Sequence, residues 1–236
     1  MHAAMVLTLI ADLSAAAAVA PVSIEEPALS GRIIQIFLLV TTLSLAPGIA
    51  MMATSLPLIV IVLSILRQGG GLQQSPPNMM IMGLAIFLTW LIMEPVFGAA
   101  WSTGVQPFLA GTIKEDDAIG KIIAPFSDFM ISRVDRADLQ ILSDARGLSV
   151  DAAATTPSLS LLAPAFVLSE IQKAFEIGFV ILLPFLIIDL LVASILMAMG
   201  MMMVPPAIVS LPFKLSFFVL TNGWVAISGA LVRSYS

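Results

Sequence analysis

Charge, histidine and cysteine are all scarce in this sequence, and each scarcity excludes a class of protein. Charged residues make up 11% of the 236 residues, whereas a typical soluble domain carries about 25%. This is too little charge to cover a water-facing surface, so the composition predicts an integral membrane protein and excludes a soluble enzyme. The absence of cysteine excludes disulfides, thiolate nucleophiles and Cys-ligated metals. The single histidine, His2, cannot form a catalytic pair or a multi-histidine metal site.

Motifs of enzymes and of nucleic-acid-binding proteins are missing as well. The net charge is −5 and no run of basic residues is present, which argues against binding to nucleic acid. The glycines at 69–71 are not followed by the Gly-Lys-Ser/Thr of a phosphate-binding loop, and neither Gly-x-Ser-x-Gly nor His-Glu-x-x-His occurs. The sequence therefore predicts a protein that is not an enzyme and that carries no cofactor or metal.

Long hydrophobic runs are what the sequence does contain, with 59% hydrophobic residues and a mean hydropathy of +1.07. The first run lies between Arg32 and Arg67, 34 residues without a charge. As one straight helix it would be about 51 Å long, against about 30 Å for the hydrocarbon core of a bilayer. The run must therefore tilt, bend or extend beyond the bilayer, and Pro47-Gly48 and Pro57 are the places where it can bend.

The hydrophobic runs pair into two hairpins around a polar section. The first hairpin occupies residues 21–101, the polar section 102–165, and the second hairpin, with a methionine-rich loop, 166–236. We therefore expect an all-α membrane protein with two long hydrophobic helical hairpins and a small polar helical section between them. Residues 1–20 are typical of a secretory signal peptide, although Asp12 interrupts their apolar stretch; a retained peripheral segment is the alternative.

The polar section holds most of the charge, since residues 114–151 contain 13 of the 25 charged residues. Apolar residues recur there every three or four positions from Ile122 to Ile141, which predicts one amphipathic helix with Pro125 in its first turn. The charged face of this helix is expected to be solvated. If residues 1–20 are a signal peptide, Arg67 is cytoplasmic and the polar section faces the exterior.

Ionisable side chains inside the hydrophobic runs are the candidate functional residues, because an ion in hydrocarbon is costly and needs a partner or water. Asp189 and Lys214 are both embedded in apolar sequence. Lys214 must reach an acid such as Glu170 or Asp189, extend its ammonium group to the interface, or line a wet cavity. Glu170, Lys173 and Glu176 share a helix face, where they either neutralise one another in part or form a solvated helix end.

Five methionines within seven residues are the most unusual feature of the second hairpin. They occupy positions 197, 199, 201, 202 and 203, directly before the break at Val204-Pro205-Pro206. Methionine is unbranched and polarizable, so it fills irregular gaps and repacks when its surroundings change. Composition leaves two interpretations open, lipid-facing filler and a deformable seal around a pore.

Three stretches are long enough to compare with known families. They are LRQGGGLQQSPPN at 66–78, the segment 164–206, and VSLPFK at 209–214 with NGW at 222–224. These stretches resemble the FliP family of the export gate of the bacterial flagellar type III secretion system. The resemblance runs from about residue 33 to the C-terminus.

The resemblance implies a pore-forming component that resides in the bacterial inner membrane, in the flagellar basal body. It implies a homo-oligomer that assembles with FliQ-type and FliR-type subunits and with other membrane proteins of the export apparatus, surrounded by membrane lipid. The implied substrates are unfolded flagellar subunits. The sequence shows no nucleotide site, and the resemblance implies that the energy comes from a proton gradient and a separate ATPase.

The resemblance also assigns roles that spacing leaves undecided. The methionine-rich loop of the family acts as a gasket across the pore, which maps onto Met201, Met202 and Met203. An ion pair between neighbouring subunits maps onto Glu170 and Lys214. The hairpins of the family stand partly beyond the bilayer, which would account for the long uncharged run.

Two positions depart from the family pattern. Leu58 stands where relatives commonly carry an arginine, and Asn222 stands where an acid often precedes Gly-Trp.

The alternative function is a small ion-coupled membrane transporter that uses Asp189 and Lys214. The oligomeric state separates the two functions, because a carrier would work as a monomer or dimer whereas a gate needs a ring with partners.

Overall fold

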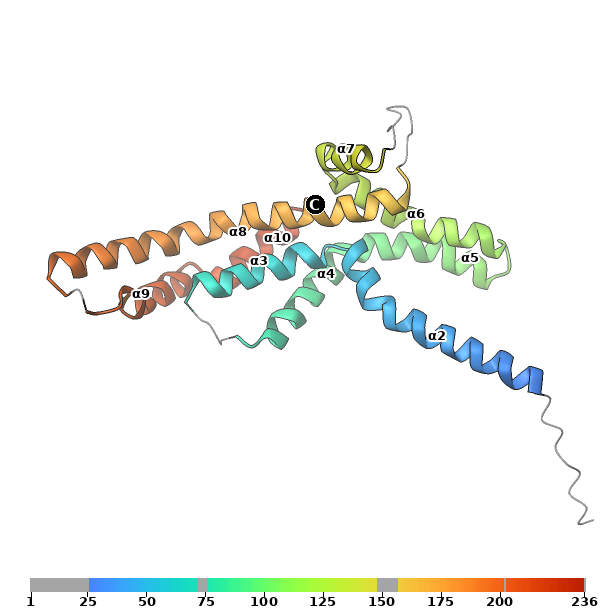
Figure 1. The fold of residues 1–236 in the computed structure, drawn as a ribbon, viewed down its shortest axis with the longest axis horizontal. Helices are drawn as coiled ribbons and strands as arrows, with labels where there is room; N and C mark the ends of the chain where they lie inside the picture. The colour runs from blue at the N-terminus through green and yellow to red at the C-terminus, as the bar shows by residue number, and fades with distance from the viewer. Residues whose placement is uncertain (1–25, 72–75, 148–156, 202, 236) are drawn as a thin grey trace, which may run out of the picture. The chain divides into compact units, whose positions relative to one another are not determined.

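The computed structural model describes residues 26–71, 76–147, 157–201 and 203–235. Every regular element in these ranges is a helix (Figure 1), which confirms the predicted all-α class. The expected signal peptide at residues 1–20 lies outside the described residues. The chain divides into two units, Met1–Pro47 and Gly48–Ser236, and the second unit holds the candidate site.

The first long hydrophobic run forms two helices. α2 covers Glu26–Ala53 and α3 covers Leu56–Gly69. The break falls beside one of the two expected places, since Pro57 occupies the first turn of α3, where its missing N–H leaves no helical hydrogen bond unmade. The chain stays helical through Pro47-Gly48, the other expected place. With 14 residues, α3 is about 21 Å long and too short to cross a bilayer alone.

The core of the second unit is built on α3, which packs against α4 (Asn78–Ala100) and α8 (Leu159–Ala198). Its buried residues lie on one helical face and are 0–2% exposed: Leu58, Ile59, Val62, Leu63 and Leu66. Gly178 of α8 permits the close approach, because a Cβ at this position would lie 2.5 Å from Cδ1 of Ile65. The departure at Leu58 thus places an apolar side chain in the centre of this core.

α4 continues without interruption into the polar section. A π-helical turn, η1 (Trp101–Val105), and the short α5 (Gln106–Leu109) extend it. Gly104 of the π-helical turn lies directly against α6 (Glu115–Arg133), because a Cβ there would be 2.9 Å from the backbone nitrogen of Ile122. The first hairpin and the polar section are therefore joined by helical packing.

The polar section contains two helices, so the prediction of one amphipathic helix was wrong. α6 ends at Arg133, and α7 (Arg136–Ala145) begins after two residues with extended backbone, Val134 and Asp135. The side chain of Asp135 accepts a hydrogen bond from the backbone N–H of Ala137 (2.9 Å) and so caps α7. Pro125 lies inside α6, not in its first turn. The helix begins earlier, at the acidic residues 115–117, whose negative charges are favourable at the positive N-terminal end of the helix dipole.

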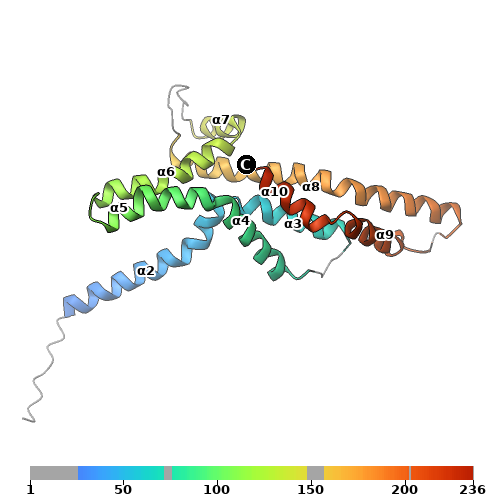
Figure 2. The same cartoon turned by 180° about the vertical axis from the view of Figure 1, so that it is seen from behind.

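The second hairpin consists of α8 and α9 (Pro206–Leu220), which pack against each other, followed by α10 (Gly223–Arg233) (Figure 2). α10 is bent by 58° from α9. Asn222 makes the bend with a left-handed φ of 49°, which asparagine tolerates better than most residues. The departure at Asn222 therefore falls at the break between the last two helices.

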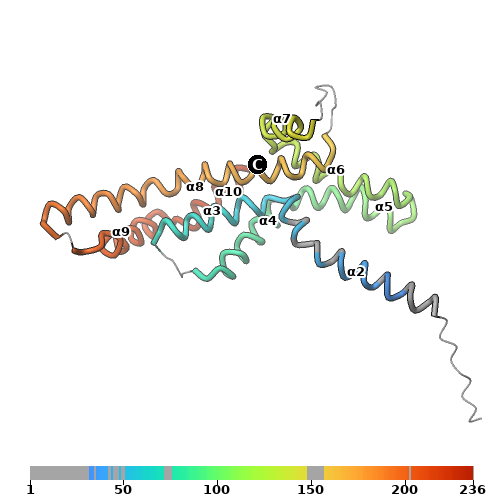
Figure 3. The backbone as a smooth tube through the Cα atoms, viewed as in Figure 1, coloured from blue at the N-terminus to red at the C-terminus, as the bar shows by residue number. Residues whose placement is uncertain are grey.

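Two helical segments within the described residues are long and apolar enough to cross a membrane, Asn78–Leu109 and Leu159–Ala198. The bent pair α9–α10 would provide a third crossing if it counts as one span. Figure 3 traces the chain through these segments. α8, with 40 residues, is about 60 Å long, about twice the thickness of the hydrocarbon core. The second hairpin is therefore long enough to extend beyond a bilayer.

Candidate functional site

The two embedded charges of the second hairpin pair with each other. Lys214 on α9 places its Nζ 2.6 Å from Oδ2 of Asp189 on α8. Ser210, one helical turn before the lysine, donates its hydroxyl to Oδ1 of the same carboxylate at 2.6 Å. Of the alternatives left open for Lys214, the structure shows the pair with an acid, and the acid is Asp189.

This network joins the two legs of the hairpin at a partly buried position. The side chain of Lys214 is 8% exposed and that of Asp189 is 37% exposed, and Ser210 is fully buried. Each oxygen of the carboxylate accepts a hydrogen bond, so neither charge is left without a partner. A buried pair of this kind adds little to stability relative to an apolar contact, but the loss of one partner leaves an uncompensated charge. We infer that the network fixes the register of α8 against α9.

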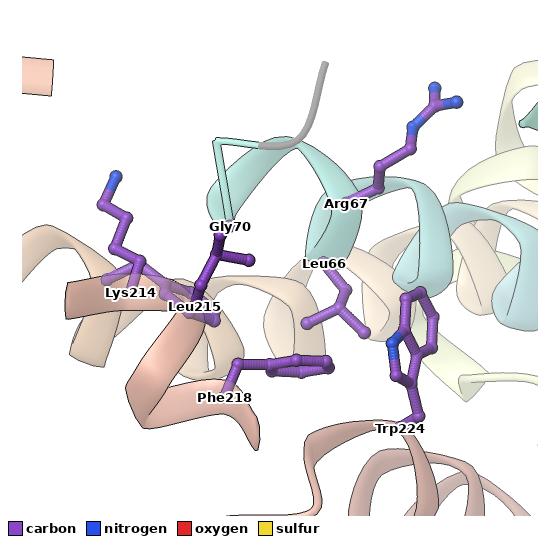
Figure 4. A pocket seen from close by; sticks show the side chains of 8 residues that line it. Leu66, Arg67, Gly70, Lys214, Leu215, Phe218 and Trp224 are labelled. Atoms are coloured by element: carbon purple, nitrogen blue, oxygen red, sulfur yellow. The ribbon is translucent and has the colours of Figure 1, made fainter. Parts of the chain in front are cut away.

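A small apolar cavity beside Lys214 shows how closely the helices pack here (Figure 4). It has a volume of about 10 Å³, enough for about one water molecule. Leu66, Phe218 and Trp224 converge on it, whereas the charged ends of Lys214 and Arg67 point away from these apolar side chains. The rings of Phe218 and Trp224 meet edge to face with centroids 5.5 Å apart. This cavity has no room for a small-molecule substrate.

The methionine-rich loop begins where Gly200 ends α8. The φ of Gly200 is +73°, and the backbone N–H of Met201 bonds to the carbonyl of Leu196 at 2.9 Å, which closes the last helical turn. Met199, Met201 and Met203 are 68%, 42% and 96% exposed. Met202, also predicted to form the seal, lies outside the described residues. The end of the hairpin thus presents exposed thioethers between two helices, and their role as a seal stays a prediction.

Glu170, the other predicted partner of Lys214, is fully buried and has different partners within the chain. Nε of Arg133 lies 3.2 Å from its Oε1, and the hydroxyl of Tyr235 donates a hydrogen bond to its Oε2. The ion pair predicted from the family joins Glu170 to Lys214 of a neighbouring subunit. One chain does not test this pair, so it stays a prediction.

The neighbours of Glu170 on its helix face also have other partners than expected. The ammonium of Lys173 donates to the backbone carbonyl of Arg133 at the end of α6, and Gln172 donates to Glu176 at 3.2 Å. The idea that Glu170, Lys173 and Glu176 neutralise one another was therefore wrong. Lys173 contacts the end of α6 instead of the acids on its own helix face. Its ammonium group donates to a carbonyl that has no helical hydrogen bond because the helix ends there.

Arg133 and Tyr235 are site residues that the sequence reasoning missed. Arg133 belongs to the charged face of the polar section, which was expected to be solvated, and no motif in the sequence indicates a role for Tyr235. One signal was available, because Tyr235 is the only tyrosine of the chain and lies three residues after Val232, the end of the last hydrophobic run. Nothing in the spacing connects it to Glu170, which lies 65 positions earlier.

Burial and the nearby charge of Glu170 raise the pKa of Tyr235 well above its ordinary value of 10.0. The folded protein should therefore keep the phenol protonated at a pH where the unfolded chain has lost its proton. The resulting stabilisation is complete below about pH 10 and is lost as the pH rises through the folded pKa. An alkaline titration followed by tyrosinate absorbance measures this without interference from other tyrosines. Ionisation near pH 10 in the native protein would contradict the contact with Glu170.

Comparison with known proteins places the chain in a family. A model described as the FliP family matches residues 39–231. The flagellar biosynthetic protein FliP of Agrobacterium fabrum is 50% identical over 207 residues, which cover 86% of this chain and 84% of the relative. The corresponding protein of Rhizobium meliloti is 48% identical over 205 residues, with the same coverage. That of Bacillus subtilis is 40% identical over 213 residues, which cover 90% of this chain and 96% of the relative. The resemblance seen in the sequence is thereby confirmed, and the chain belongs to the FliP family.

Proposed function

We propose that this protein is a pore-forming core component of the flagellar type III export gate and passes unfolded flagellar subunits across the bacterial inner membrane. Membership of the FliP family and relatives named flagellar biosynthetic proteins support the proposal. The apolar helices long enough to cross a membrane support its location there. In this role the protein carries out no chemical reaction.

The exposed methionines at the end of the second hairpin are the observation that carries the proposal. A closed gate needs an apolar constriction that ions cannot wet and that yields when a chain passes through it. Thioether side chains suit both needs, because they are apolar and have several rotatable bonds. Met201 and Met203 are exposed in a loop that follows α8, a helix about twice as long as the hydrocarbon core is thick.

The buried network behind the loop complements this arrangement. Asp189, Lys214 and Ser210 tie α8 to α9, so the legs of the hairpin keep their register while the loop deforms. The same geometry argues against the ion-coupled transporter. The carboxylate is already paired on both oxygens, and the cavity beside Lys214 holds about one water molecule, not a substrate.

Apolar grooves on the second unit support assembly with further subunits. One groove of about 530 Å³ lies between α8 and α10, and another of about 610 Å³ lies between α4 and α10. Large apolar side chains are exposed along α4 and α8 as well, among them Phe87, Phe175 and Phe179. We propose that these surfaces face other copies of this chain, FliQ-type and FliR-type subunits, and lipid.

Purification of the full-length protein from its membrane in mild detergent, with mass measurement of the intact complex, tests the proposed function. We expect several copies of this chain together with membrane proteins of the FliQ and FliR types. A monomer or dimer that moves ions by itself after reconstitution would overturn the gate and support the transporter. The Asp189→Asn variant is the matched control for transport, since a carrier that uses this carboxylate would lose its coupling.

A further inference from the structure

Glu170 joins three segments that are far apart in the sequence. The residue lies on α8, its Oε1 pairs with Arg133 at the end of α6, and its Oε2 accepts the hydroxyl of Tyr235, two residues after α10. With 0% exposure, the carboxylate has no access to water. Both of its oxygens are therefore satisfied by side chains of this chain, one from the polar section and one from the C-terminal segment.

The ring of Tyr235 and its neighbour strengthen the same junction. The guanidinium carbon of Arg133 lies 4.0 Å from the centroid of the tyrosine ring, within the range of a cation–π contact. Phe129 of α6 stacks on the ring with a centroid distance of 6.0 Å and an angle of 14° between the planes. Arg133 also donates from one of its terminal nitrogens to the backbone carbonyl of Ser234 at 2.8 Å. The last described residues are thus held by charge, by hydrogen bonds and by aromatic packing at once.

α10 packs on the core of the second unit through a few residues, since Leu231 belongs to the core and Trp224 and Ile227 pack against it. Only Gly223 and Leu231 among its residues are buried, and an apolar groove of about 530 Å³ separates part of its length from α8. The helix begins at the left-handed Asn222. A helix with few buried contacts opens at low free energy unless its ends are fixed. The position of α10 therefore depends on these few core contacts, on the bend at one end and on the contacts of Tyr235 at the other.

We propose that Tyr235, Glu170 and Arg133 form a latch that holds the end of α10 against α8 and α6. Tyr235 is its movable part and a positioning residue, since it acts through the buried carboxylate. While the latch is closed, the polar section and the last helix of the second hairpin are held as one body. When the hydroxyl leaves Glu170, the C-terminal end of α10 loses this anchor while its core contacts remain, and the end of α6 loses a contact at the same time. The latch rests on these contacts alone and does not require the proposed role in export.

Hydrogen exchange of the full-length protein in detergent tests the latch. Tyr235→Phe removes one oxygen and keeps the ring, so the contacts with Phe129 and Arg133 remain while Oε2 of Glu170 loses its donor. We expect exchange to become about tenfold faster or more in two places, because a buried acceptor is left unpaired. One is the last turn of α10. The other is the amide of Val134, which bonds to Met130 at the end of α6 (2.9 Å).

The control is Ser234→Ala, which lies next to the tyrosine but leaves the backbone carbonyl that binds Arg133 in place. We expect no change at Val134 in this variant. Faster exchange confined to α10 in Tyr235→Phe would overturn the latch, because the tyrosine would then stabilise only its own helix. Unchanged exchange in both places would overturn it as well. The amides of α9 around Lys214 report whether the variants remain folded and should not change.

Discussion

Replacing Met201, Met202 and Met203 by alanine will leave the assembled complex intact and make the membrane permeable to ions. The substitutions remove the long apolar ends of the side chains and keep the loop, its closing glycine and the network behind it. Assembly is preserved because Met201 and Met203 are exposed and contribute little to the packing of the chain. The wider constriction admits water, and ions follow it. If the barrier falls by about 1.4 kcal/mol, permeation rises about tenfold.

Passive leak of ions in cells or vesicles that contain the variant complex measures this effect. The matched control replaces Met79 and Met80, which are 88% and 66% exposed at the start of α4, far from the loop in sequence. These substitutions remove the same kind of side chain and should leave the membrane tight. Equal leak in both variants would point to a general loss of integrity, and a tight membrane in the loop variant would refute the seal.

The Lys214→Glu substitution will have the second largest effect. It places a second carboxylate next to that of Asp189, at a position where the lysine side chain is only 8% exposed. The pair at 2.6 Å becomes a repulsion, and the hydroxyl of Ser210 cannot compensate for it. Breaking a buried ion pair lowers the free energy of unfolding by about 3–5 kcal/mol. Because Asp189 is partly exposed, we expect a loss at the lower end, about 3 kcal/mol. Thermal unfolding in detergent measures the loss in the single chain, and native mass measurement shows the loss of assembly.

Two second-site substitutions separate the contact within the chain from the one predicted between subunits. Asp189→Lys restores opposite charges on α8 and α9, so we expect it to recover most of the thermal stability. Glu170→Lys should recover assembly in part if Lys214 reaches the Glu170 of a neighbour. It cannot recover it fully, because it also removes the partner of Arg133 and Tyr235.

The outcomes of the two rescues are independent. No recovery by Asp189→Lys would show that the contact between α8 and α9 does not hold the hairpin. No recovery by Glu170→Lys would remove the pair between subunits and leave the contact within the chain untouched. Lys214→Arg is the control for both, since it keeps the charge while changing the shape of the donor.

Features that depend on local sequence were predicted well. The all-α class follows from apolar runs too long and too free of charge for a soluble protein, because backbone groups in hydrocarbon must satisfy each other. The break before α3 lies beside Pro57, which occupies the first turn of α3, whereas the other expected place, Pro47, stays inside a helix. The break between α6 and α7 was not predicted, because the helical spacing of apolar residues continues across it. The side chain of Asp135 caps α7 there and so starts a new helix.

The sequence indicated which charged residues need a partner better than it indicated which residue that partner is. Asp189 and Lys214 were both singled out as costly charges, but spacing left Glu170 and Asp189 equal as partners for the lysine. Glu170 was selected as well, whereas Arg133 was assigned to solvent. A helical period states which residues share a face and does not state which helix will cover that face.

The amino-acid sequence by itself determined a membrane-embedded helical chain, the place of its methionine-rich loop and its membership of the FliP family. These depend on the length of apolar runs, on proline and on runs of consecutive residues, which are all properties of neighbours along the chain. Only the tertiary structure decided that Lys214 meets Asp189, 25 positions away, and that Glu170 meets Tyr235, 65 positions away. Each of these contacts arises because helix packing brings distant polar groups together where at least one partner is shielded from water and needs the other.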